Sequence, residues 1–245
     1  MPLISVITVC FNSEKTIRRT IESVLNQTIK ELEYIIVDGA SKDHTLEIAK
    51  EYERAFWEKG YDYTIISEPD KGIYDAMNKG IRASKGEITG IINSDDWYEK
   101  NALERVSLVY KEKPFDMFYA DLYIWKNENT RFIKHSRLRN PVVSRDWNHP
   151  TTFIKKEIYD KLGYYKLESL HDDWDFYLKV RNFTDKITVL NEPLANFTFG
   201  GISNKKSLKN SISRGKARYR IYLNNGYSRL YWFECVLIEA VKFIF

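Results

Sequence analysis

Buried strands and amphipathic helices alternate along the first 95 residues or so, and this alternation constrains the fold most strongly. Apolar, β-branched runs predict strands, whereas apolar residues three and four apart predict helices. The predicted strands cover 3–10, 33–38, 63–67 and 88–93, and the predicted helices cover 14–26 (with Ser13 as N-cap), 46–52 and 73–83. The pattern is typical of an α/β fold whose parallel sheet has helices on both faces. Such sheets bind ligands at the carboxyl ends of their strands.

The pattern changes after Asp96, where strands and helices no longer alternate regularly. The sequence there predicts helices at 101–113, 156–162 and 173–182, a hairpin of strands at 115–125 and 131–135, and strands at 151–154 and 187–190. Beyond residue 200 the chain becomes basic and aromatic, and we expect a helical tail over 205–245. The second part of the chain is therefore predicted to be a smaller, mixed region joined to the first.

Length, composition and cysteine content indicate the size of the fold and the cellular compartment. The chain has 245 residues, 43% of them hydrophobic, which is enough for one α/β domain with an appendage. Cys10 and Cys235 lie in apolar surroundings, and two buried free thiols fit a reducing cytoplasm. The N-terminus has no signal-peptide pattern, and no stretch is long and apolar enough to span a bilayer. We expect a cytoplasmic protein.

Positive charge is concentrated at the C-terminal end. The net charge is +4, yet residues 205–245 hold nine Lys and Arg against two Glu. Basic and apolar residues interleave in this tail, among them Arg214, Arg218, Arg220 and Arg229. A tail of this kind is suited to an anionic surface such as membrane lipid or nucleic acid. The alternative is a solvated basic helix, or a helix pair for capping or dimerisation, packed on the body of the protein.

Two adjacent acids, Asp95 and Asp96, directly follow the predicted strand 88–93. Neighbouring carboxylates repel each other unless a cation or several donors balance them. A divalent ion such as Mg²⁺ or Mn²⁺, shared with substrate phosphates, would supply that balance. The alternative is that Asp95 caps the helix beginning near Asn101 while Asp96 is solvated.

Two further acidic positions are candidates for chemistry. Asp38 ends the second strand, where an acid can accept hydrogen bonds from a ribose or base, although it can equally be a turn residue before Gly39. Asp172, Asp173 and Asp175 open a later helix, where the helix dipole alone favours acids. A carboxylate there can also act as a general base toward an attacking hydroxyl. Neither a GxGxxG nor a P-loop motif follows any strand, which argues against dinucleotide enzymes and P-loop NTPases.

Taken in order, several segments resemble the family 2 glycosyltransferases, over about residues 3–200. The resemblance rests on the motifs SVITVCFN at 5–12, SVLNQT at 23–28, EYIIVDGASKDHT at 33–45, EPDKGIYDAMNKG at 68–80 and NSDD at 93–96. It implies the GT-A fold, a Rossmann-like, mostly parallel sheet. Residues 1–97 would form the nucleotide-sugar-binding half, and 98–204 the acceptor-binding and catalytic-base half of the same domain.

The resemblance also implies roles for single residues. Nucleotide-binding residues would be Thr8, Asn12, Glu14, Asp38, Lys71 and Asp95. Asp96, together with Asp95, would hold Mn²⁺ or Mg²⁺, and Asp173 would be the catalytic base. Asp172, His149 and Trp174 would lie near the acceptor. Asn93 or Ser94 stands where the family's metal motif begins with Asp, which leaves the ligand set open, and the Gln-x-x-Arg-Trp motif of processive members is missing.

The expected activity is inverting transfer of a sugar from a nucleotide-diphosphate donor, UDP-hexose foremost, to a saccharide acceptor. A lipid-pyrophosphate-linked glycan of bacterial surface-polysaccharide synthesis is the expected acceptor, because the tail suits the inner face of the cell membrane. Nucleic acid is not expected as a partner, and a homodimer is left open. The alternatives are a nucleotidyltransferase or a non-catalytic glycan-binding module of similar fold.

Overall fold

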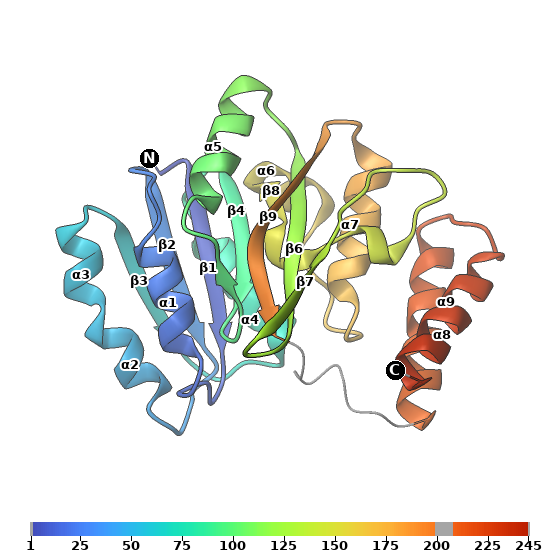
Figure 1. Cartoon of the computed structure of the whole chain (residues 1–245), viewed down its shortest axis with the longest axis horizontal. Coiled ribbons are helices and arrows are strands. Elements are labelled where there is room, and N and C mark those ends of the chain that lie inside the picture. The colour runs from blue at the N-terminus through green and yellow to red at the C-terminus, as the bar shows by residue number, and fades with distance from the viewer. Residues whose placement is uncertain (1, 199–207, 245) are drawn as a thin grey trace.

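The computed structural model describes residues 2–198 and 208–244 and forms one curved sheet covered by helices (Figure 1). The sheet has the strand order β3-β2-β1-β4-β8-β6-β9-β5, and β7 pairs with β6. The strands are β1 (Ile4–Cys10), β2 (Leu32–Asp38), β3 (Asp62–Ser67), β4 (Ile88–Asn93), β5 (Trp97–Tyr98), β6 (Met117–Asn127), β7 (Thr130–Lys134), β8 (Phe153–Lys155) and β9 (Ile187–Thr198). The helices are α1 (Ile17–Leu25), α2 (Thr45–Glu51), α3 (Glu53–Glu58), α4 (Ile73–Ala83), α5 (Ala102–Glu112), α6 (Lys156–Leu162), α7 (Asp172–Phe183), α8 (Leu208–Asn224) and α9 (Tyr231–Ile244), with 3₁₀ turns at Ser144–Asp146 and His149–Thr151.

The N-terminal half of the sheet is parallel, as predicted. β1 pairs in parallel with β2 and β4, and β2 pairs in parallel with β3. Every residue of β1 and β2 is buried, because helices cover both faces of the sheet. One apolar core lies under α1, α2, α3 and α5, and a second lies under α4, α6, α7 and the C-terminal helices. The continuous apolar runs in the sequence therefore reflect a sheet that is buried on two sides.

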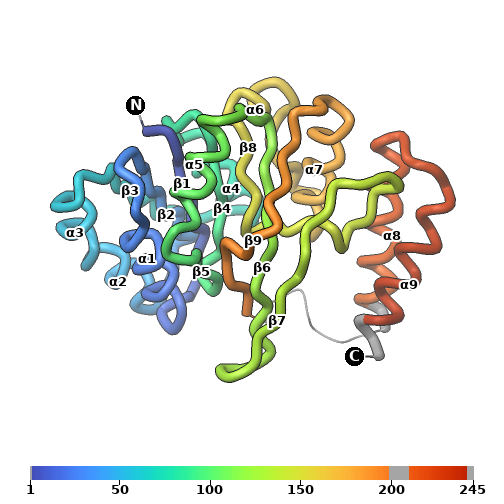
Figure 2. Tube along the Cα trace, turned by 45° about the horizontal axis from the view of Figure 1, so that its top comes forward, coloured from blue at the N-terminus to red at the C-terminus, as the bar shows by residue number. Residues whose placement is uncertain are grey.

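The second half of the sheet is mixed. β8 runs antiparallel to β4 and β6, whereas β9 runs parallel to β6. The hairpin of β6 and β7 turns between Asn127 and Thr130, as predicted. One sheet thus runs through both halves of the predicted domain, which places the ends of β4 and the start of α7 on one scaffold (Figure 2).

The sequence misplaced several element boundaries. The first helix begins at Ile17 instead of Glu14, because the Ser13 carbonyl accepts the N–H groups of Thr16 and Ile17 while the Ser13 hydroxyl turns back to Phe11. Ser13 is therefore not the N-cap. α3 and β5 were not predicted. β9 extends to Thr198, well past the predicted end at 190, because a register shift lets its second part pair again with β6.

The last two helices lie side by side at one end of the molecule, next to α7 (Figure 1, red). They confirm a helical tail, although 205–207 and 245 of the predicted tail lie outside the described residues. In the described ranges, no helix combines the length and apolarity needed to cross a membrane. The inner side of this helix pair joins the second core through Ile221, Tyr222 and Cys235.

Candidate functional site

The carboxyl ends of the four parallel strands lie in register. Cys10 pairs with Asp38, Asp38 pairs with Ser67, and Val9 pairs with Asn93. The loops that follow these ends therefore gather along one edge of the sheet, as the alternation predicted. That edge carries most of the polar side chains that the sequence singled out.

Asp38 organises the loop that follows β2. Its carboxylate is only 1% exposed and accepts hydrogen bonds from the Ser41 N–H, the Ser41 hydroxyl and the Ser67 hydroxyl, the last at 2.7 Å. Asn12, in the left-handed region at φ 49°, accepts the Lys42 N–H at 2.9 Å. The structure thus brings Asn12 and Asp38 together at one rim of the sheet.

The Glu14 side chain lies among the loops at this edge of the sheet, whereas the Thr8 side chain is buried within β1. The Glu14 carboxylate accepts the His44 N–H at 3.1 Å, so Glu14 joins the loops that follow β1 and β2. Thr8 is fully buried within β1, and its hydroxyl accepts a hydrogen bond from Tyr34 at 3.0 Å. The Thr8 side chain is therefore part of the core in this structure, and its contact with a nucleotide stays a prediction.

The acidic pair at the end of β4 differs in burial. Asp96 is fully buried, and neither carboxylate oxygen has a hydrogen-bond partner among the described residues. Burial, and then the neighbouring Asp95 carboxylate, raise the pKa of Asp96 well above its ordinary value, while the nearby Thr198 backbone and the Arg19 guanidinium oppose this effect. Asp95 is half-buried, and burial raises its pKa as well. A buried carboxylate without partners is costly as an anion, so a bound cation would stabilise its charged form.

Neighbouring groups fix the backbone of this pair. Thr20 donates its hydroxyl to the Asp96 carbonyl at 2.6 Å, and Arg19 donates to the Asp95 carbonyl at 2.9 Å. The Arg19 guanidinium also lies 3.5 Å from the centre of the Trp97 ring. The alternative role for Asp95 is wrong, because α5 has Asn101 as its N-cap residue and the Gln27 side chain accepts the Leu103 N–H in the first turn of this helix at 3.0 Å.

Asp95 and Asp96 fit a divalent ion that shares its coordination with a substrate. Carboxylate oxygens are the ligands Mg²⁺ and Mn²⁺ prefer, and Mg²⁺ in particular often takes only one or two of them from a protein. Across the described ranges, no group of three or more His, Cys, Asp and Glu residues is arranged to hold a metal. The remaining ligands would therefore come from phosphate and water, in line with the buried unpartnered oxygens of Asp96.

Asp173 lies at the start of α7, across from α4. One of its carboxylate oxygens, Oδ1, accepts the Tyr74 hydroxyl at 2.9 Å and the Trp174 N–H at 2.8 Å. No hydrogen bond from a described residue reaches its other oxygen, Oδ2. Burial lowers the pKa of His149, and the nearby Asp173 carboxylate opposes this effect. The structure thus places His149 near Asp173 and leaves one oxygen of Asp173 available, while their role toward an acceptor stays a prediction.

The residues on either side of Asp173, Asp172 and Trp174, make contacts within the fold. Asp172 is 3% exposed, and its carboxylate accepts the N–H groups of Glu168 and Ser169 and the Ser169 hydroxyl. Trp174 is 3% exposed and stacks on Tyr177 with ring centres 4.8 Å apart. The Trp174 ring therefore packs in the core, and its contact with an acceptor stays a prediction.

The loop before α4 connects the two parts of the site. Lys71 lies in this loop and lines a groove with Tyr74 on one side and residues 167–170 on the other. The loop packs closely on the end of β2, because a Cβ on Gly39 would lie 2.3 Å from Asp70 Oδ2. Tyr74 was not predicted as a functional residue, although its motif was noticed. The available sequence signal is a tyrosine two residues after the glycine that ends the loop, and no local pattern distinguishes such a tyrosine from a core residue.

Comparisons with known proteins agree with this geometry. The sequence model of Glycosyl transferase family 2 matches residues 5–171. A PGL/p-HBAD biosynthesis glycosyltransferase from Mycobacterium bovis is 30% identical over 210 residues, covering 83% of this chain and 80% of the relative. TarS 1–349 of S. aureus, solved in complex with UDP, has a TM-score of 0.70 at 20% identity over 95% of this chain and 68% of its own.

A second solved structure is as similar in fold. Mannosyltransferase PcManGT from Pyrobaculum calidifontis, in complex with GDP-Man and Mn²⁺, has a TM-score of 0.71 at 15% identity, covering 99% of this chain and 72% of its own. The family match spans the strand ends that carry Asp38 and Asp96 and reaches the loop before Asp173. The chain is therefore a member of glycosyl transferase family 2 and has the GT-A fold.

Proposed function

We propose that this glycosyltransferase moves a sugar, with inversion, from a nucleotide-diphosphate donor to a saccharide acceptor, and that UDP-hexose is the donor. The buried, unpartnered carboxylate of Asp96 carries the proposal, because it lies at the sheet edge where Asp38 and Asn12 also lie. TarS has been solved with UDP and with UDP-GlcNAc, and PcManGT with GDP-Man and Mn²⁺. These complexes support a nucleotide-sugar donor.

In this proposal, the donor is held by the strand ends. Asn12, Glu14 and Asp38 would surround the nucleoside, with Lys71 and Asp95 nearer to the ribose and diphosphate. Asp96 and Asp95 would hold Mn²⁺ or Mg²⁺. When bound, that ion would neutralise negative charge on the leaving diphosphate. Arg19, which donates to the Asp95 backbone, would keep this acidic turn in place.

Asp173 is the proposed general base. Its free oxygen would take the proton of an acceptor hydroxyl while that hydroxyl attacks the anomeric carbon from the face opposite the diphosphate. A single displacement of this kind inverts the anomeric centre. Tyr74 would hold the carboxylate in one orientation through its 2.9 Å hydrogen bond. His149 lies on the acceptor side of the same base.

A lipid-linked saccharide in bacterial surface-polysaccharide synthesis is the proposed acceptor. Relatives bear names such as PGL/p-HBAD biosynthesis glycosyltransferase and, at 38% identity over 104 residues, chondroitin synthase of Escherichia coli. These names are consistent with glycolipid or polysaccharide products. The enzyme would then act at the cytoplasmic face of the cell membrane.

Thermal unfolding with UDP and Mn²⁺ tests the donor proposal. We expect the two together to stabilise the protein by about 3 kcal/mol at a hundredfold excess over their dissociation constant. For a chain of this size, that corresponds to a rise in melting temperature of roughly 2–4 °C per kcal/mol. UDP alone or Mn²⁺ alone should have a much smaller effect. An equal response to ATP, or none to the pair, would favour the nucleotidyltransferase or the binding module instead.

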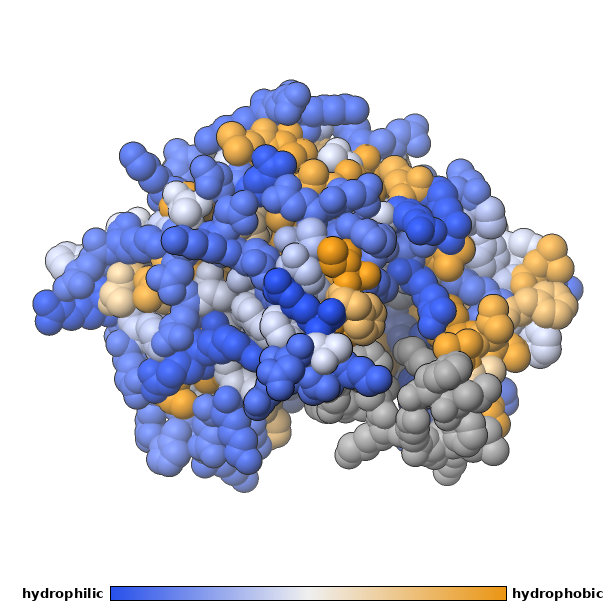
Figure 3. Space-filling model, viewed as in Figure 1, coloured by the Kyte–Doolittle hydropathy of each residue, from blue (hydrophilic) through white to orange (hydrophobic). Residues whose placement is uncertain are grey.

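The outer face of α9 supports the membrane part of the proposal. Leu230, which precedes α9, and four apolar side chains on α9 are 46–71% exposed, the four being Trp232, Phe233, Val236 and Leu237. They gather at the end of the molecule formed by the C-terminal helices (Figure 3). An apolar helix face of this kind can lie in the acyl boundary of a bilayer while neighbouring cations contact lipid phosphates.

Not all of the predicted cations are available for lipid. Arg214 and Arg218 form ion pairs with Glu239 inside the helix pair, at 3.0 and 3.4 Å. Arg220 lines a pocket shared with the loop that precedes α7. Lys216 and Arg229 remain exposed. The apolar face thus contributes more to the proposed membrane contact than charge does.

Sedimentation with anionic liposomes tests the membrane contact. We expect a Trp232→Glu, Phe233→Glu variant to pellet at least tenfold less than the wild-type chain, because two charges would enter the acyl boundary. Trp57→Glu is the matched control, since Trp57 is 78% exposed on α3 and lies outside the face. Equal pelleting of both variants would contradict the proposal, and so would a wild-type chain that forms dimers through this face without binding lipid.

A further inference from the structure

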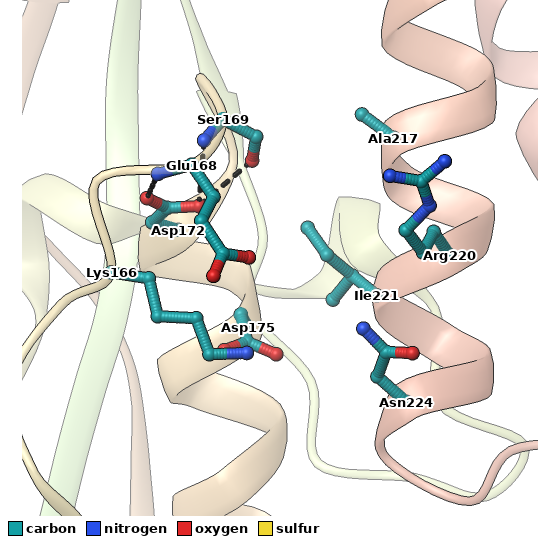
Figure 4. Close-up of a pocket in the computed structure, with 9 residues that line it drawn as sticks. All are labelled: Lys166, Glu168, Ser169, Asp172, Asp175, Ala217, Arg220, Ile221 and Asn224. Carbon is teal, nitrogen blue, oxygen red and sulfur yellow. Dashed lines mark hydrogen bonds and ion pairs between the residues drawn. The ribbon is translucent and has the colours of Figure 1, made fainter.

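A polar pocket separates the loop before α7 from the C-terminal helix α8 (Figure 4). Lys166, Glu168 and Ser169 reach it from the loop, whereas Arg220 and Asn224 reach it from α8. None of these residues belongs to the proposed donor or metal site. The pocket therefore needs its own explanation.

The loop side of the pocket is held firmly. Asp172 accepts three hydrogen bonds from Glu168 and Ser169, at 2.8–3.1 Å. Asp175 accepts the Asn225 side chain at 2.7 Å and lies 3.3 Å from Lys166. The wall is thus built on the first turn of α7, the same turn that carries the proposed base.

Three side chains present polar ends that the protein itself does not use. Glu168, Arg220 and Asn224 form no side-chain hydrogen bond or ion pair with any described residue. They supply one acceptor group, one cationic donor group and one amide that does both. Ala217 and Ile221 add a small apolar surface between them. Convergent polar groups over an apolar patch are a feature of small-molecule sites, but this cavity of about 90 Å³ is smaller than most of them, so a ligand would enter it only in part.

The chemistry of the pocket favours a polyhydroxyl ligand. Sugar hydroxyls donate and accept hydrogen bonds, and a pyranose ring has apolar C–H faces, so both kinds of lining would be used. Three carboxylates, from Glu168, Asp172 and Asp175, stand against two cations, so a phosphate would be repelled. A purely apolar ligand would leave the charged groups desolvated without partners.

The position of the pocket links it to the reaction. Glu168 and Ser169 also line the groove that contains Tyr74, so a single loop separates the pocket from the proposed base. We propose that the pocket is an acceptor subsite, which binds a sugar unit of the acceptor glycan remote from the reacting hydroxyl. This inference rests on the proposed function. It adds that the acceptor is a glycan of more than one sugar unit.

Acceptor-length kinetics test the subsite. The probes are labelled mono-, di- and tetrasaccharides of glucose, galactose, mannose and N-acetylglucosamine, assayed with the UDP-sugar that the enzyme hydrolyses. For at least one series, we expect kcat/KM of the wild-type enzyme to rise by about tenfold from monosaccharide to tetrasaccharide. Arg220→Ala and Asn224→Ala should each lower kcat/KM for the tetrasaccharide by roughly 3- to 10-fold, the loss of one hydrogen bond. The monosaccharide rate should not change.

Lys216→Ala is the matched control, because Lys216 is an exposed cation on α8 that does not line the pocket. It should leave every rate unchanged. A wild-type enzyme without length preference in any series would overturn the subsite, and so would pocket variants that keep the full preference. If UDP and Mn²⁺ also failed to stabilise the wild-type protein, the proposed function would fail with it. Stabilisation by the pair together with unaltered pocket variants would remove the subsite alone.

Discussion

Replacement of Asp173 by Asn should lower the rate of sugar transfer by about 10²–10⁴-fold, the usual contribution of a general base. The amide has nearly the same shape as the carboxylate, and its oxygen can still accept the Tyr74 hydroxyl that Asp173 accepts at 2.9 Å. It cannot, however, take the proton of an acceptor hydroxyl. The measurement is kcat with the best donor and acceptor, alongside the melting temperature with UDP and Mn²⁺. The UDP response should be unchanged, because Asp173 lies outside the proposed donor site.

Two tyrosines provide a graded control for this result. Tyr74→Phe keeps Asp173 but removes the hydroxyl that orients it, so we expect a loss of about tenfold in kcat with KM for the donor unchanged. The Tyr165 ring lies next to that of Tyr74, tilted by 44° with ring centres 5.5 Å apart. Its own hydroxyl lies 3.4 Å from that of Tyr159, and no hydrogen bond joins it to Asp173. Tyr165→Phe should therefore retain the wild-type rate. Near-normal turnover of Asp173→Asn would remove the base assignment.

Local sequence patterns predicted the strand ends well, because a parallel sheet places successive ends at one edge whatever its exact register. Asp38 and Asn12 thus meet at the predicted rim. Thr8 shows the limit of the same reasoning. In β1 both faces are buried, so no alternation of polar and apolar residues reveals which side chains point toward the edge. The burial of Thr8 and its hydrogen bond from Tyr34, which lies on the neighbouring strand, show that its side chain belongs to the core.

Contacts between distant segments were beyond the reach of local patterns. Arg218 was predicted to face lipid, yet it pairs with Glu239, 21 residues later, because α8 and α9 fold against each other. The sequence showed the charge of the tail but not the partner. Asp172 was grouped with Asp173 as a functional acid, whereas its carboxylate closes the loop at Glu168 and Ser169. Adjacent residues at a helix start point in different directions, and sequence alone does not show which of them meets the ligand.

Replacement of Asp96 by Asn should have opposite effects on stability and on ligand response. The free energy of unfolding of the metal-free protein should rise by about 1–3 kcal/mol, because a buried charge without partners is removed. The stabilisation by UDP with Mn²⁺, and with it most of the transferase activity, should disappear. Because the pKa of Asp96 is raised in the folded state, the wild-type protein loses stability as pH rises above the ordinary carboxyl range. The advantage of the variant should therefore shrink as pH is lowered into that range.

A second buried acid provides the contrast that makes this prediction specific. Asp146 is 8% exposed, as deeply placed as many core residues, but it accepts Arg139 at 2.5 Å. Asp146→Asn removes a charge that has a partner, so that variant should lower the free energy of unfolding and leave the response to UDP and Mn²⁺ intact. The comparison requires only thermal melts of three proteins with and without the ligand pair. If Asp96→Asn were destabilised as Asp146→Asn is, or if it still responded to Mn²⁺, Asp96 would be a structural residue, and the ion would have to be held elsewhere.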